Sequence, residues 1–198
     1  MNFKTKMKKN NCILIVSLLS LIGWNAYAGD IDKSKVNKIK AGLLYNMAKM
    51  TTWPESGFIN DEPIVILFLG KDHNEIGNYF KSQVQSLSLT VKGRKLAVKQ
   101  LTRTKLDDVV RKEVKQCHIL FIMSSYKGPI LELLHAIGDS PVLVVGETSS
   151  FSIEGGMIGL SIEKKRVKIS VNLDAVKGKD LKISAQLLQH AKIVKTEQ

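Results

Sequence analysis

The sequence contains little cysteine: only Cys12 and Cys117 among 198 residues. Cys12 lies in an N-terminal segment that we expect to be removed, which would leave Cys117 as the single thiol of the mature chain. One thiol cannot form an internal disulfide, even in a compartment that favours disulfides. Cys117 opens the apolar run CHILFIM, which predicts a buried strand where a free cysteine packs as a small hydrophobic residue. Redox control through an intermolecular disulfide is the alternative.

The chain also lacks an apolar run long enough for a comfortable membrane span, which needs about 20 residues. Its most apolar run, residues 12–24, follows a lysine-rich start and precedes the small-residue sequence Ala26-Tyr27-Ala28. This order is typical of a secretory signal peptide. We therefore predict a cleaved signal over residues 1–28, a single mature domain over residues 29–198 and a periplasmic location.

Acidic residues are outnumbered. The predicted signal holds four of the 30 basic residues and none of the 18 acidic ones, so 26 basic and 18 acidic residues remain, a net charge of +8. The lysines are scattered along the chain rather than clustered with aromatic residues, which argues against nucleic acid as a partner. We interpret them as a soluble surface that tolerates anionic headgroups nearby.

Motifs of catalysis and metal binding are missing. The histidines share no ligand spacing, and no acid-rich cluster accompanies them; they are His73, His118, His135 and His190. GGMIGL (residues 155–160) does not match a phosphate-binding glycine motif, and no G-x-S-x-G elbow occurs. The sequence therefore predicts no metal, no cofactor and no enzymatic activity.

Short apolar runs alternate with amphipathic helical patterns from residue 63 to about residue 147. The runs PIVILFLG, HILFIMS and PVLVVGE predict buried parallel strands. Helices are expected within residues 74–87, 106–116 and 128–138, and a β-type segment with a Lys92-Gly93 turn over residues 89–101. This alternation predicts a single α/β domain with a mostly parallel sheet flanked by helices.

The pattern changes after residue 156. MIGLSIEKKRVKISVNL predicts two strands joined by a tight turn near Lys164 and Lys165, hence an antiparallel hairpin. In residues 181–194, apolar side chains spaced four, four and three apart predict a final helix.

The stretch GLLYNMAKMTTWPES (residues 42–56) has helical spacing and ends at an aromatic residue and a proline. We predict a helix from Val36 to about Trp53, where Pro54 disfavours helical geometry. Its apolar side is expected to face the core, with Leu44 and Ala48 alongside Ile39, Leu43, Met47 and Met50. On its polar side, Tyr45 and Lys49 are candidate partner contacts.

Ligands of open parallel sheets bind outside the carboxyl ends of the strands. Short polar loops are expected at that edge here, and the candidate pocket residues are Gly70, Asp72, Ser124, Ser125, Glu147 and Thr148. Helix capping and turn formation explain the same residue types without a ligand.

In combination, these segments resemble the YfiR family of periplasmic proteins. The resemblance runs from about Lys40 to Val194, in the expected order, and rests on LLYNMAKMTTWP, CHILFIMSS, PVLVVGE, GGMIGLSIEKKRVKISVNLDA and LKISAQLLQHAKIV. It implies a compact α/β domain, seen as dimers, that binds the periplasmic sensor region of an inner-membrane diguanylate cyclase and holds it inactive. It also implies an outer-membrane lipoprotein that relieves the repression. Cys117 matches a cysteine-bearing strand of the family, without a second mature cysteine to pair with it.

Two functions follow as hypotheses. The first is repression of a membrane diguanylate cyclase through protein contact. The second is a periplasmic small-molecule-binding sensor that serves a histidine kinase or receptor. Ligand-dependent stabilisation would distinguish the second from the first.

Overall fold

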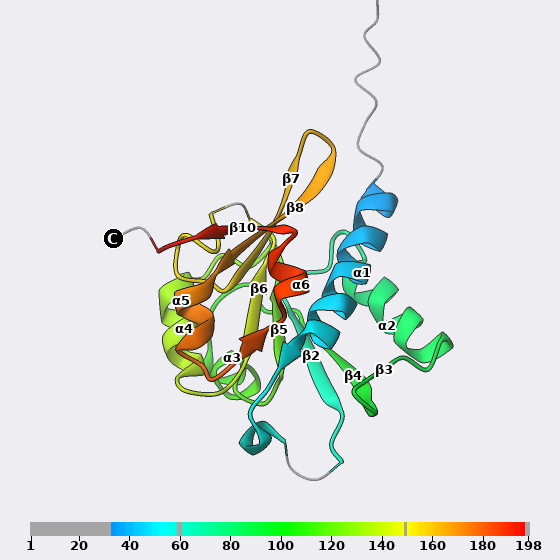
Figure 1. Cartoon of the computed structure of the whole chain (residues 1–198), viewed down its shortest axis with the longest axis horizontal. Helices are drawn as coiled ribbons and strands as arrows, with labels where there is room; N and C mark the ends of the chain where they lie inside the picture. The colour runs from blue at the N-terminus through cyan, green and yellow to red at the C-terminus, as the bar shows by residue number, and fades with distance from the viewer. Residues whose placement is uncertain (1–32, 59–60, 149, 197–198) are drawn as a thin grey trace, which may run out of the picture. The chain divides into compact units, whose positions relative to one another are not determined.

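The computed structural model describes residues 33–58, 61–148 and 150–196 (Figure 1). The predicted signal, residues 1–28, lies outside the described residues. The predicted fold class is confirmed: strands and helices alternate through the middle of the chain and form a mostly parallel sheet with helices on both faces. None of the described helices is long and apolar enough to cross a membrane.

Among the described residues, eight strands form one sheet in the order β10-β8-β7-β6-β5-β2-β4-β3. Neighbours are parallel except in the β3–β4 and β7–β8 hairpins. The strands are β2 (Ile64–Leu69), β3 (Thr90–Val91), β4 (Arg94–Leu101), β5 (Ile119–Ile122), β6 (Leu143–Gly146), β7 (Ile158–Glu163), β8 (Arg166–Asn172) and β10 (Ala191–Val194). The residues of β5 and β6 are all buried, because helices and loops cover both faces of these central strands.

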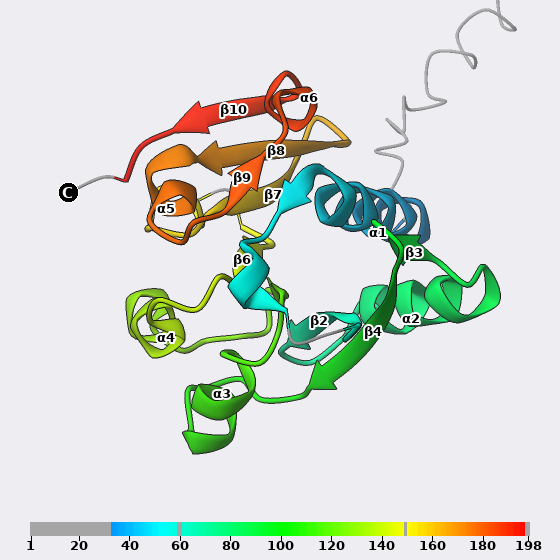
Figure 2. The ribbon, with the colours of Figure 1, turned by 60° about the horizontal axis from the view of Figure 1, so that its bottom comes forward.

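Six helices lie in the described residues: α1 (Lys33–Met50), α2 (Ile76–Ser86), α3 (Asp108–Glu113), α4 (Ile130–Ile137), α5 (Leu173–Lys177) and α6 (Ala185–Leu188). Phe80 of α2 packs on Phe68 of β2, with ring centroids 5.9 Å apart. Helices α3 and α4 lie on the side of the sheet away from α1 and α2 (Figure 2).

The sheet curls around α1. Figure 2 shows α1 between β8 on one side and the β3–β4 hairpin on the other. A two-stranded sheet, β1 (Thr51–Thr52) paired antiparallel with β9 (Lys182–Ile183), ties the end of α1 to the C-terminal region. Helix α1 therefore contacts segments that are distant from one another in the sequence.

Both predicted hairpin turns are confirmed. Lys92 and Gly93 have φ values of 51° and 80°, and Lys164 and Lys165 have 47° and 63°. Two successive positive φ values match the twist of the flanking strands, as in type I′ turns.

The predicted final helix is wrong. Residues 181–194 instead form β9, the single-turn helix α6 and β10. Ser184 starts α6 by accepting a hydrogen bond from the Gln186 N–H, and the Ser184 N–H donates to the Met50 carbonyl. The backbone groups of β9 and β10 pair instead with β1 and β8, so strand pairing with distant segments takes the place of the hydrogen bonds within a helix.

The expected apolar side of α1 is correct only in part. Met47 is fully buried and Leu43 and Met50 pack against the core, but Ile39 is 42% exposed. The buried side is centred on Val36, Lys40, Ala41, Leu44, Met47 and Ala48. Because the sheet curls and α2 packs alongside, α1 buries a face rotated from the predicted stripe.

Candidate functional site

The carboxyl edge of the sheet has a topological switch point. The chain passes from β2 to β4 on one side and then returns to β5 on the other. Gly70 directly follows β2, and Ser124 and Ser125 lie just after β5, so three of the predicted pocket residues lie at the switch point. This is where open α/β sheets bind ligands.

Hydrogen bonds join the loop after β2 to the loop after β5 at the switch point. The Ser125 Oγ accepts a hydrogen bond from the Lys71 N–H at 2.7 Å and donates to the Lys71 carbonyl at 3.0 Å. Gly70 has a φ of 120°, and a Cβ there would lie 2.6 Å from the Ser125 Oγ. Glycine at position 70 therefore permits the close approach of the two loops.

Asp72 also bonds within the fold. Its Oδ2 accepts hydrogen bonds from the Asn78 N–H and the Gln100 Nε2, both at 3.0 Å. Asp72 thus satisfies an amide of the first turn of α2 and fixes that helix against β4, which is the structural role that capping predicts.

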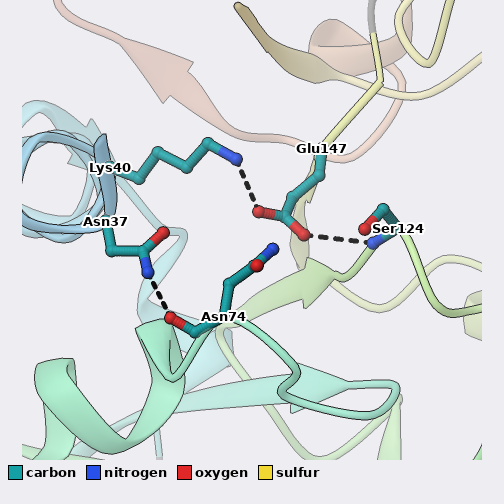
Figure 3. Close-up of polar contacts among 5 residues, drawn as sticks. All are labelled: Asn37, Lys40, Asn74, Ser124 and Glu147. Carbon is teal, nitrogen blue, oxygen red and sulfur yellow. Dashed lines mark hydrogen bonds and ion pairs between the residues drawn. The ribbon is translucent and has the colours of Figure 1, made fainter. Parts of the chain in front are cut away.

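Glu147, which follows β6, forms a buried ion pair with Lys40 of α1 (Figure 3). The Lys40 Nζ lies 2.7 Å from the Glu147 Oε1, and the two side chains are 7% and 4% exposed. The Glu147 Oε2 accepts a hydrogen bond from the Ser124 N–H at 3.1 Å. Both carboxylate oxygens are therefore bonded within the chain, one to a helix and the other to the loop after β5.

Sequence analysis did not single out Lys40. The signal was present: Val36, Lys40 and Leu44 are spaced four apart, which places a lysine on a buried helical face. Such a lysine requires an anionic partner, because an unpaired charge is costly to bury.

A second contact joins α1 to this edge. The Asn37 Nδ2 donates to the carbonyl of Asn74, in the loop before α2 (Figure 3). Helix α1 thus bonds directly to the loops after β2 and β6, and through Glu147 to the loop after β5. Asp72, Ser125 and Glu147 thus all bond within the chain, and the Asp72 Oδ1 is buried without a hydrogen-bond partner among the described residues.

A cavity of about 280 Å³ remains between the loops after β5 and β6. Its polar lining includes Ser124, Tyr126, Lys127, Glu147, Thr148 and Glu154. The Tyr126 hydroxyl is buried and has no hydrogen-bond partner among the residues that the structure describes. Burial raises the pKa of this hydroxyl, and the nearby Glu132 carboxylate raises it further. Thr148 and Glu147 thus border a small space, whereas Gly70 and Asp72 do not.

The two candidate contact residues of α1 differ. Tyr45 is half-buried, and its hydroxyl donates to the Thr90 carbonyl of β3 at 3.0 Å. The exposed Lys49 Nζ lies 5.5 Å from the centre of the Tyr45 ring. Tyr45 therefore helps to hold α1 on the β3–β4 hairpin, whereas Lys49 is exposed.

A family model described as YfiR/HmsC-like matches residues 37–192 of this sequence. The chain belongs to the YfiR/HmsC-like family. Membership supports, in general terms, a periplasmic regulator of cyclic di-GMP signalling with a protein partner, and the family is regulatory rather than catalytic. No match was found among curated proteins.

Solved structures share the fold at low identity. A conserved domain protein from Vibrio cholerae O1 biovar El Tor has a TM-score of 0.55 and 11% identity over 78% of this chain. An ABC domain in complex with L-Trp, from Streptococcus pneumonia, has a TM-score of 0.54 and 10% identity over 78% of this chain. A ligand-free, open structure of the substrate-binding protein CD0873 from Clostridium difficile has a TM-score of 0.50 and 13% identity over 79% of this chain. This YfiR/HmsC-like chain covers 60%, 60% and 58% of those chains, respectively.

Cys117 is buried in this family member, as the sequence predicts. Its Sγ donates to the Val114 carbonyl at 3.4 Å, and burial raises its pKa well above the ordinary thiol value. Thiol chemistry requires the thiolate, so the folded chain holds Cys117 in its unreactive form. Within the described ranges, no group of three or more His, Cys, Asp or Glu side chains is placed to hold a metal ion.

Proposed function

We propose that this chain represses an inner-membrane diguanylate cyclase by binding its periplasmic sensor region. The family match over residues 37–192 carries the proposal, since it covers nearly all of the described domain. The identity of the cyclase partner and the sign of the effect are the parts of this proposal that an experiment tests.

The geometry of the carboxyl edge supports a binding role over a catalytic one. Asp72, Ser125 and Glu147 bond to backbone and side-chain groups of the chain itself. A general base or nucleophile needs a polar atom within hydrogen-bond reach of a substrate. We therefore propose that the chain acts without catalysis, through contact with another protein.

Repression by binding is a population shift. The chain favours the inactive arrangement of the sensor region only to the extent that it binds that arrangement more tightly than the active one. Converting a cyclase from 99% active to 99% inactive requires about a 10⁴-fold difference in affinity. A tight complex with the isolated sensor region is thus a necessary property of the proposed repressor.

Cellular cyclic di-GMP provides the test. The nucleotide is measured in wild-type cells, in a deletion strain, and in that strain complemented with the full chain or with a chain lacking residues 1–28. We expect deletion to raise cyclic di-GMP and only the full chain to restore it. If deletion leaves the nucleotide unchanged, repression of a cyclase is the wrong function.

The cavity beside Tyr126 favours a second candidate, a small-molecule sensor for a kinase or receptor. Its volume of about 280 Å³ would fit a small polar molecule, and its lining offers polar side chains such as Ser124, Thr148 and Glu154 for hydrogen bonds. A small-molecule panel is screened by thermal unfolding, and stabilisation should grow with the logarithm of ligand concentration. The response should weaken in Glu154→Gln, which removes one charge from the lining of the cavity. A hit with equal effect on both proteins would place the ligand elsewhere.

A further inference from the structure

The concave face of the β7–β8 hairpin continues the apolar core outward. Strand register places Ile162 opposite Val167 and Leu160 opposite Ile169, so these four side chains share one face. Leu160 and Ile169 are buried, whereas Ile162 is 42% exposed. The apolar face thus extends past the part of the sheet that the helices cover.

Helix α1 presents apolar residues to the same region. A groove of about 730 Å³ is lined by Ile39 and Leu43 of α1 and by Val167 and Ile169 of β8. Ile39, the residue that departs from the predicted core stripe, is 42% exposed. Its position is explained if it contributes to the surface of the groove rather than to the core.

The border of the groove is strongly basic. Residues 158–172 and 191–195 contain six basic residues and one acidic residue, Glu163. The basic residues are all exposed: Lys164, Lys165, Arg166, Lys168, Lys192 and Lys195. Lys168, Lys192 and Glu163 themselves line the groove, and Lys164 and Lys165 form the turn that projects beyond the sheet in Figure 1.

We propose that this groove, between α1 and the β7–β8 hairpin, binds an acidic amphipathic segment of the protein that the chain regulates. Apolar side chains of the segment would contact Ile39, Leu43 and Val167, while its carboxylates would face the lysines of the hairpin. This inference rests on the proposed function, which it deepens by naming the contact surface and the chemistry of the partner.

Charge complementarity and shape favour a protein segment over a lipid surface. Such complementarity steers association and fixes the orientation of the partners. Interfacial membrane sites project large apolar side chains, Trp and Phe among them, into the headgroup region. The exposed large hydrophobic residues of the described chain are aliphatic, and the lining of this groove is concave rather than projecting.

The hairpin turn allows a variant that removes charge without straining the fold. Lys164→Asn/Lys165→Gly deletes two charges and introduces the residue pair that type I′ turns prefer, so the hairpin should be at least as stable. Ile39→Gln tests the apolar lining at an exposed position. Matched controls away from the groove are Lys112→Ala/Lys115→Ala and Leu131→Gln, at exposed positions on or near α3 and α4.

Each variant is expressed as the full chain in the deletion strain, and cyclic di-GMP and thermal unfolding of the purified protein are measured. We expect about fivefold weaker repression by the hairpin variant and by Ile39→Gln, with unfolding midpoints within about 2 °C of wild type, and wild-type repression by both controls. If the wild-type chain fails to repress, the proposed function fails. If it represses and the groove variants repress equally well, only the docking surface is wrong.

Two further outcomes would also overturn the docking surface. Equal loss of repression in the control lysine variant would indicate a general charge effect. Sedimentation of the wild-type protein with phosphatidylglycerol vesicles at physiological salt, abolished by Lys164→Asn/Lys165→Gly, would assign the basic border to lipid.

Discussion

The Lys40 Nζ lies 2.7 Å from the Glu147 Oε1, across 107 residues of sequence, and both side chains are almost completely buried. The pair joins α1 to the end of β6, and Glu147 carries the contact on to the loop after β5. Together with the Asn37–Asn74 hydrogen bond, this salt bridge joins α1 to the edge of the sheet where open α/β folds bind ligands.

Removing only one partner of this ion pair should destabilise the folded protein. Lys40→Met leaves the Glu147 carboxylate buried without its cation, which we expect to reduce the free energy of unfolding by about 3–5 kcal/mol. The double variant Lys40→Met/Glu147→Gln removes both charges, and its free energy of unfolding should fall by less than that of Lys40→Met. Urea titration of the three proteins measures the difference. The exposed pair Lys99–Glu113 is the control, and Lys99→Met should cost no more than about 1 kcal/mol. A Lys40→Met protein as stable as wild type would show that the ion pair does not anchor α1.

Local patterns predicted much of this fold. The apolar runs around Phe68, Phe121 and Val145 predicted three buried strands, and the register places these strands side by side. Lys92-Gly93 and Lys164-Lys165 were recognised as turns because the alternation of apolar residues breaks at those points.

Contacts between segments distant in the sequence determine the parts of the structure that local patterns did not predict. Residues 181–194 have helical spacing, yet their backbone groups bond to β1 and β8, whose positions depend on the rest of the chain. The pairing of Lys40 with Glu147 likewise depends on how α1 crosses the curled sheet. The predicted strand-end residues do lie along one edge, but the sequence could not show that Ser125, Asp72 and Glu147 bond within the chain.

The Phe151 ring packs between two glycines. A Cβ on Gly146 would lie 2.3 Å from the ring, and a Cβ on Gly156 would lie 2.1 Å from it. Gly156→Ala should therefore reduce the free energy of unfolding by about 1–3 kcal/mol through overpacking. Phe151→Leu in the same chain should recover part of that loss, because the two substitutions share one contact. Additive losses in the double variant would contradict this packing.

At Gly42, in contrast to Gly156, substitution of glycine by alanine is expected to stabilise the protein. It is exposed within α1, and a Cβ there would meet no atom within 4 Å. Gly42→Ala should raise the free energy of unfolding by about 1 kcal/mol, because alanine loses less backbone entropy than glycine in a helix. Urea titration measures the gain, and a destabilised protein would show that this side of α1 is covered.

The burial of Cys117 predicts an unreactive thiol. With its pKa raised by burial and only 5% of the residue exposed, the native protein should react with Ellman's reagent far more slowly than the urea-unfolded protein. It should also remain monomeric on a non-reducing gel after mild oxidation. Rapid stoichiometric labelling in native buffer, together with a disulfide-linked dimer, would revive redox control.

His118 is held as a neutral ring by its burial and by the hydrogen bond that its Nδ1 accepts. Its Nδ1 accepts from the Val65 N–H at 3.0 Å, which requires that nitrogen to be unprotonated, so Nε2 carries the proton and donates to the Gly57 carbonyl at 3.1 Å. The Phe58 ring stacks on the imidazole with centroids 4.6 Å apart. Burial lowers the pKa of His118; the Gly57 hydrogen bond and Glu62 oppose this shift, and Arg94 adds to it.

Folding stability should therefore fall in mild acid. Because the folded pKa of His118 is below the unfolded value of about 6.5, the unfolded chain binds the proton more readily. The stability that His118 contributes should be fully present above pH 6.5 and lost as pH falls toward the folded pKa. Urea titrations at pH 7.5 and 5.5 should show a larger loss for wild type than for His118→Gln, which has no proton to gain in this range. The exposed His135→Gln should keep the wild-type loss. If wild type and His118→Gln lose equal stability, other groups cause the pH dependence and the neutral ring is not its source.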